Sequence, residues 1–187
     1  MSYSRTATFL MTLAAAAVAY AAVTIDVLVA YDQSAARWLA GNNVDGQTLA
    51  SDTIGTMNSF LPATELDKHF TFRLVGTMFS AAEATGADST ARLHDAINSV
   101  ADGETGKPSG LWKDIQTARE TYKADVVLVL VDVGDESSGL GGISWGMGKE
   151  ALSSLSEFAP WAYSVCRVQL ACKYGVVAHE VGHVMGA

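Results

Sequence analysis

The residues best suited to chemistry lie near the end of the chain, where His179, Glu180 and His183 fall within one short segment. On an α-helix, residues four positions apart project from the same face, about one turn apart. Two neutral histidines at this spacing can bind one Zn²⁺ ion. Glu180 directly follows the first histidine, where it can act as a general base on a metal-bound water. The pattern predicts a zinc site with His179 and His183 as ligands and Glu180 as the catalytic residue.

The residues around this motif favour a functional site over an ordinary helix. Five apolar side chains flank it and predict a largely buried helix: Val176, Val177, Val181, Val184 and Met185. Two histidines and a glutamate without partners would be costly to bury there. The chemistry expected of such a site is hydrolysis of peptide bonds in a protein or peptide substrate.

A family resemblance follows from the wider motif. His179-Glu180-x-x-His183-x-x-Gly186 resembles the first eight positions of the metzincin signature, whose eleventh position is a third zinc-binding histidine. In that family the glycine allows the turn that ends the active-site helix. The strand-like opening, 24–31, followed by a long helix, resembles the bacterial reprolysin-like group, which includes peptidyl-Asp metalloendopeptidases. Because the sequence stops at Ala187, we expect a catalytic domain truncated before its third zinc ligand.

Two other functions remain open at this stage. One is a non-catalytic secreted module that binds extended peptides on a metzincin-like scaffold. The other is a zinc hydrolase whose third ligand is a distant glutamate, although Gly186 argues against it. The remaining histidines, His69 and His94, are expected to be solvated surface residues and not zinc ligands.

Composition limits the partners and the number of domains. The chain has 187 residues, 49% of them hydrophobic, which is enough for one substantial core in one domain. The net charge of −8 disfavours nucleic acid or an anionic membrane surface as the main partner. We expect a monomer.

The first 22 residues differ from the rest. Arg5 is the only charged residue before Asp26, and an alanine-rich apolar run extends from Phe9 to Ala22. Small residues at alternating positions then predict a signal peptide over 1–22, cleaved near its end. The alternatives are an uncleaved anchor or a buried helix. We expect a secreted protein, extracellular or periplasmic, with no stable membrane association after cleavage. Residues 23–187 are expected to form the N-terminal part of a metzincin-like catalytic domain.

Hydrophobic periodicity predicts the fold class. Strands are expected at 23–30, 70–75, 126–131 and 161–168, with helices between the first three. The unbroken apolar run at 126–131 is typical of a central strand covered on both faces. The order predicts an α/β fold: a mixed, mostly parallel twisted sheet of about five strands, flanked by helices and ending in the active-site helix.

A glycine-rich segment, 139–148, precedes the last strand and fits no phosphate-binding loop. The metzincin resemblance implies that this place in the chain holds an antiparallel edge strand, which binds substrate main chain to main chain. It makes Gly142, Ile143, Ser144 and Trp145 candidate substrate-binding residues. The alternative is a plain flexible loop.

The only two cysteines, Cys166 and Cys172, lie just before the predicted active-site helix. In an oxidising compartment they could close a small loop as a disulfide. Pairing of one of them with a cysteine outside this sequence is the alternative. A zinc role is not expected, since their spacing is not that of a zinc motif.

For the 187-residue chain alone, the sequence predicts weak zinc binding and little peptidase activity, because two histidines leave two of four zinc positions to water. Zinc titration with chelator competition and a casein cleavage assay measure both. Robust casein cleavage by the purified 187-residue chain would contradict this account of an incomplete site.

Overall fold

A computed structural model describes residues 22–134, 139–146 and 155–186. Most of the predicted signal peptide and the last two residues of the glycine-rich segment lie outside this part. The described strands form one sheet in the order β2-β1-β3-β5-β4. Their bounds are β1 (Val23–Tyr31), β2 (Phe70–Phe79), β3 (Val126–Val131), β4 (Gly142–Ser144) and β5 (Tyr163–Arg167). All neighbouring strands pair in parallel except β4, which pairs with β5 in the antiparallel sense.

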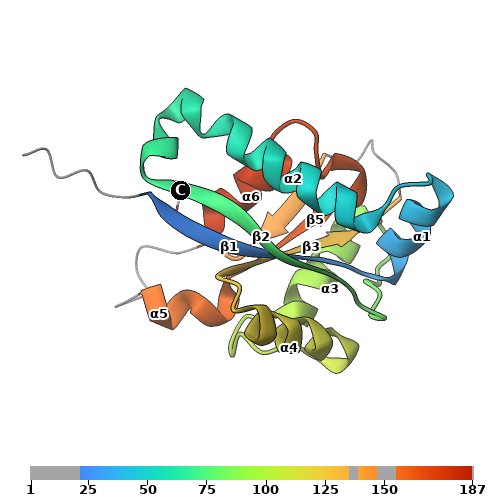
Figure 1. The fold of residues 1–187 in the computed structure, drawn as a ribbon. Helices are drawn as coiled ribbons and strands as arrows, with labels where there is room; N and C mark the ends of the chain where they lie inside the picture. The colour runs from blue at the N-terminus through green and yellow to red at the C-terminus, as the bar shows by residue number, and fades with distance from the viewer. Residues whose placement is uncertain (1–21, 135–138, 147–154, 187) are drawn as a thin grey trace, which may run out of the picture.

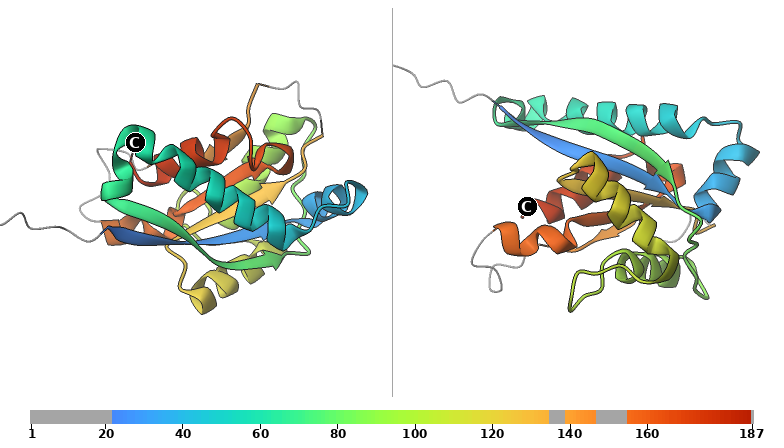
Figure 2. Two further views of the ribbon diagram at one scale, coloured as in Figure 1. Left: turned by 45° about the horizontal axis from the view of Figure 1, so that its top comes forward. Right: turned by 60° about the horizontal axis from the view of Figure 1, so that its bottom comes forward.

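Helices cover both faces of this sheet (Figure 1). They are α1 (Gln33–Gly41), α2 (Gly46–Phe60), α3 (Ser89–Val100), α4 (Lys113–Tyr122), α5 (Leu155–Phe158) and α6 (Val176–Val184). Short 3₁₀ helices lie at Pro62–Thr64, Leu66–Lys68, Gly110–Trp112, Ala159–Trp161 and Val168–Leu170. In the two views of Figure 2, α2 and α6 lie on one side of the sheet and α3 and α4 on the other.

Two hydrophobic cores result, one on each face of the sheet. Side chains that alternate along a strand point to opposite faces, so β3 supplies both cores. Leu128 and Leu130 pack with α1, α2 and α6, whereas Val127 and Val129 pack with α3 and α4. Every residue of β3 is buried. The predicted α/β fold, with a mostly parallel sheet and an antiparallel edge strand, is confirmed.

The structure extends some predicted elements. Strand β2 continues to Phe79, four residues beyond the predicted end, and pairs along the whole length of β1. The last strand begins at Tyr163 because a 3₁₀ turn occupies Ala159–Trp161. None of the described helices is long and apolar enough to cross a membrane.

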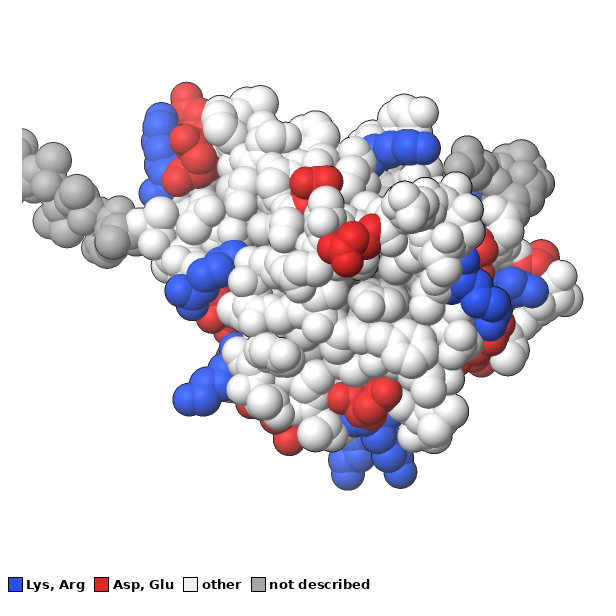
Figure 3. Space-filling model, turned by 45° about the vertical axis from the view of Figure 1, so that its right-hand side comes forward, with Lys and Arg blue, Asp and Glu red and all other residues white. Residues whose placement is uncertain are grey.

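Surface charges contribute little to this architecture. On the face shown in Figure 3, acidic and basic side chains are interspersed. Ion pairs among the described residues include Arg37–Glu83, Lys68–Glu65 and Arg73–Asp26, each with an exposed cation. Pairs of this kind typically stabilise a protein by less than about 1 kcal/mol. Burial of the two cores is therefore the main source of stability.

One buried carboxyl group connects the ends of the central strands. Asp32 is fully buried and accepts hydrogen bonds from Ser34 Oγ at 2.6 Å, Ala35 N at 2.8 Å and Ala84 N at 3.1 Å. It caps α1, and Ser34 Oγ in turn accepts from Asp132 N, just after β3, at 2.9 Å. Burial raises the pKa of Asp32 above its ordinary value.

Replacing this residue, Asp32→Ala, should lower the free energy of unfolding by about 3 kcal/mol. The change removes a helix cap and leaves buried N–H groups without acceptors. Asp45 is the matched control, because it caps α2 through Thr48 N at 2.7 Å but lies in solvent. Urea denaturation of both alanine variants measures the difference. An equal loss in the two variants would contradict a special role for the buried cap.

Candidate metal and catalytic site

Helix α6 presents the predicted catalytic motif at the edge of the sheet. The chain leaves β5, turns through a 3₁₀ helix and enters α6 at Gly175, whose φ of 69° is left-handed. Val177, Val181 and Val184 bury one side of the helix in the core. At its other end Gly186 has a φ of 88°, a conformation that glycine adopts at low cost after a helix. A glycine that ends this helix agrees with the role that the resemblance implied.

The two histidines converge as the sequence predicted. His179 Nε2 and His183 Nε2 lie 3.1 Å apart, with ring centroids 4.5 Å apart and ring planes at 78°. Two lone pairs at this distance repel unless a proton or a cation lies between them. Nitrogens bound to one tetrahedral Zn²⁺ at about 2.0–2.1 Å lie about 3.3 Å apart. The pair therefore fits two corners of a zinc site.

Within residues 22–134, 139–146 and 155–186, no group of three or more His, Cys, Asp and Glu side chains is placed to hold a metal ion. His69 and His94 are exposed and lie on other elements, as expected of surface residues. The described residues thus bring together two candidate nitrogen ligands, both from α6.

Glu180 lies on the buried side of the histidine pair, and only 7% of its surface is exposed to solvent. Its Oε2 atom accepts a hydrogen bond from Ser144 Oγ at 2.9 Å. Ser144 Oγ also lies within hydrogen-bonding distance, 3.0 Å, of Ser164 Oγ on β5. Ser144 has one hydroxyl proton, which it donates to the Glu180 carboxylate. The hydroxyl group of Ser164 therefore donates to Ser144 Oγ. The carboxylate is thus held from β4 by a chain of two hydroxyl groups.

The segment predicted to bind substrate forms β4 and the residue after it, but its side chains point inward. Gly142 and Ser144 face α6, while Ile143 packs in the core on the other face of the sheet. Trp145 Nε1 donates to Ala101 O at 3.0 Å. Any contact of this strand with a substrate would therefore come mainly from its main chain.

Strand β4 lies at the edge of the sheet, and no strand of the described part pairs with its outer side. Arg167 N donates to Gly141 O at 3.0 Å, which fixes the hydrogen-bonding alternation of the antiparallel pair. By that alternation the N–H and C=O groups of Gly142 and Ser144 point away from β5. The outer edge of β4 thus offers main-chain groups for an added strand.

The predicted disulfide between Cys166 and Cys172 is contradicted, since both are free thiols. Cys166 is fully buried against Gly142, whereas Cys172 Sγ lies 3.5 Å from Thr53 Oγ1 on α2. The thiols therefore occupy different environments. Burial, together with the nearby charge of Glu180, raises the pKa of Cys166 well above its ordinary value. This thiol is neutral and serves as a packing group.

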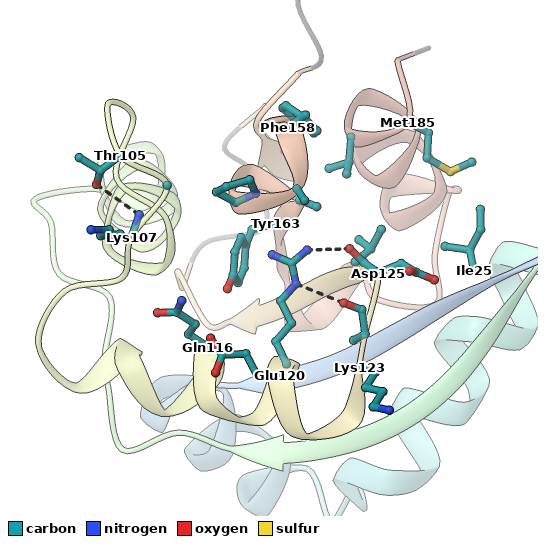
Figure 4. A pocket seen from close by; sticks show the side chains of 18 residues that line it. Ile25, Thr105, Lys107, Gln116, Glu120, Lys123, Asp125, Phe158, Tyr163 and Met185 are labelled. Carbon is teal, nitrogen blue, oxygen red and sulfur yellow. Dashed lines mark hydrogen bonds between the residues drawn. The ribbon is translucent and has the colours of Figure 1, made fainter. Parts of the chain in front are cut away.

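A pocket of about 920 Å³ lies near the amino ends of β3 and β5 (Figure 4). The wall formed by α4 includes Arg119, which donates to Ala124 O and Asp125 O and lies 5.1 Å from the centre of the Tyr163 ring. The pocket reaches Met185 at the end of α6, but His179, Glu180 and His183 do not line it. This hollow is therefore separate from the candidate site.

An active-site helix packed on a mostly parallel sheet, beside an antiparallel edge strand, defines a metzincin-like α/β fold. Residues 21–187 match the family Reprolysin_5, described as metallo-peptidase family M12. The chain belongs to this family of metallopeptidases. The family assignment supports hydrolysis of peptide bonds in proteins or peptides as the class of activity.

Other comparisons address the fold alone. No curated protein matches this chain. A solved structure described as "Structure of a chaperone-substrate complex" matches with a TM-score of 0.58 and 16% sequence identity. The match covers 88% of this chain and 23% of the other, so the present chain spans less than a quarter of that protein's length.

Sequence reasoning singled out His179, Glu180 and His183 as candidates but missed the contacts around Glu180. Cys166 borders Glu180 from β5, Ser144 holds the Glu180 carboxylate, and Ser164 contacts Ser144. The signal that could have found Ser164 is its position directly opposite Ser144 in the β4–β5 pair. That register depends on tertiary structure.

Gly142→Ala should disturb this site. A Cβ atom there would lie 2.7 Å from Glu180 Cγ and 2.8 Å from Val165 O, and the backbone atom cannot move easily. Overpacking of this kind typically costs about 1–3 kcal/mol. Gly146→Ala is the control in the same segment, because its Cβ would meet no atom of the described residues within 4 Å. Thermal and urea denaturation compare them; equal stability of the two variants would show that Gly142 is not a close contact.

Proposed function

We propose that this protein is a secreted zinc endopeptidase, with His179 and His183 as metal ligands and Glu180 as the general base. The observation that carries the proposal is the 3.1 Å approach of the two Nε2 atoms on a helix that also buries Glu180 beside them. Membership of the M12 metallopeptidases supports the class of reaction. The metal is proposed from the donor atoms and their spacing.

A zinc ion bound there would supply Lewis acidity, polarising the scissile carbonyl and making a bound water more acidic. Glu180 would accept the proton of the attacking water and deliver it to the leaving amine. Its Oε2 is engaged by Ser144, which leaves Oε1 for the proton. General acid–base catalysis of this kind typically contributes about 10²–10⁴-fold.

The open edge of β4 is the proposed binding place for the substrate. An extended peptide would pair with the outward main-chain groups of Gly142 and Ser144 as an added strand. Pairing of this kind recognises backbone more than side chains, which suits an endopeptidase acting on extended segments. Gly142, Ile143, Ser144 and Trp145 would shape this edge.

Secretion is proposed from the N-terminal sequence. The apolar run up to Ala22 and the small residues near its end are typical of a cleaved signal peptide. Strand β1 starts directly after it, at Val23. N-terminal sequencing of the exported protein would place the cleavage site.

In the full-length product of the gene, Glu180→Gln should keep zinc but lower proteolysis by about 10²-fold or more, because the amide cannot accept the proton. Elemental analysis and a quenched-peptide assay measure the two quantities. His179→Ala is the companion variant and should lose zinc as well as activity.

The opposite result would be equally clear. Unchanged turnover in Glu180→Gln would remove this residue from the mechanism. Zinc-free protein that still binds extended peptides would instead favour a non-catalytic binding module.

A further inference from the structure

We infer that Ser144 is a positioning residue for Glu180, and that it links the substrate-binding edge to the general base. The inference rests on the proposed function and assigns a second role to a residue of the substrate-binding edge. The residue touches neither the histidines nor the reacting atoms in the described contacts. It acts through the carboxylate that it holds.

The geometry of the contact carries the first step. Ser144 Oγ lies 2.9 Å from Glu180 Oε2, within the normal range for a hydroxyl group that donates a hydrogen bond. Glu180 is 7% exposed, so few water molecules compete for this oxygen. A carboxylate in such a place keeps one orientation only if a donor fixes it. Ser144 is that donor.

The support behind Ser144 carries the second step. Ser164 is fully buried, and its Oγ lies 3.0 Å from Ser144 Oγ, which orients the hydroxyl proton toward Glu180. The next residue, Trp145, is anchored by its bond to Ala101 O. Pairing with β5 holds the strand from the side. The hydroxyl is therefore preorganised by strand β5 and by the contact of Trp145 with Ala101, the residue that follows α3.

The position of Ser144 in the ladder carries the third step. Its side chain faces α6, while its main-chain N–H and C=O point to the open edge of β4. Ser144 would thus bind an added strand through its backbone, while its hydroxyl group contacts Glu180. Seating a peptide on this edge would order the strand and, with it, the carboxylate orientation.

The test is kinetic and uses the full-length enzyme. Ser144→Ala should lower kcat about 10- to 100-fold with KM changed less than about 2-fold, since a donor to a charged group is lost from the transition state. Ser144→Thr keeps the hydroxyl and should retain activity within about 3-fold. Zinc content should be unchanged in both. Ser51→Ala, an exposed serine on α2, is the neutral control.

A double-mutant cycle separates positioning from general damage. In the Glu180→Gln background, Ser144→Ala should cause little further loss, because the group it positions is already gone. Equal additional loss in that background, or equal losses in Ser144→Ala and Ser144→Thr, would overturn the inference. If Ser144→Ala does not fold, Ser164→Ala replaces it; it should lower kcat about 3- to 10-fold, and wild-type kcat there overturns the inference.

The two proposals fail differently. Full activity in Glu180→Gln removes the proposed mechanism itself. An inactive Glu180→Gln together with a fully active Ser144→Ala removes only the role of Ser144.

Discussion

The close approach of β4 and α6 is the constraint on which the candidate site depends. Gly142 lies so near Glu180 that a single added carbon would overlap the Cγ atom of the glutamate and a main-chain oxygen of β5. Because glycine has no side chain, α6 can pack closely against β4. The Glu180 carboxylate is then buried, and the histidines lie toward the surface. The burial of Glu180 and the position of the edge strand beside it both depend on that one contact.

Much of the fold could be predicted because its signals are local. The uniform apolar run of β3 reveals a strand covered on both faces, and alternation marks the strands beside it. Three aspartates, Asp32, Asp45 and Asp88, cap the first three helices through N–H groups close in sequence. Caps of this kind depend on short segments of sequence. The full length of β2 was harder to predict, because it is set by pairing with β1.

The candidate site likewise combines local features, which the sequence predicts, with tertiary contacts, which it does not predict. The spacing of His179 and His183 is a property of one helix, so the sequence predicts their 3.1 Å approach. The serine pair beneath Glu180 joins two strands whose register no local pattern specifies. The cysteines show where a local signal misleads. Their nearness in sequence suggested a disulfide, but Cys166 faces α6 and Cys172 faces α2. The two thiols point to different elements, so the predicted disulfide does not form.

The order of strands in the sheet has a consequence for how the protein matures. Strand β5 pairs with β3 and not with β1, and both β4 and α6 contact β5. Such distant parallel pairings close large loops and form late in folding. The residues of the proposed site lie on β4, β5 and α6, at the end of this series of pairings. The proposed site is therefore complete only when the whole sheet has formed.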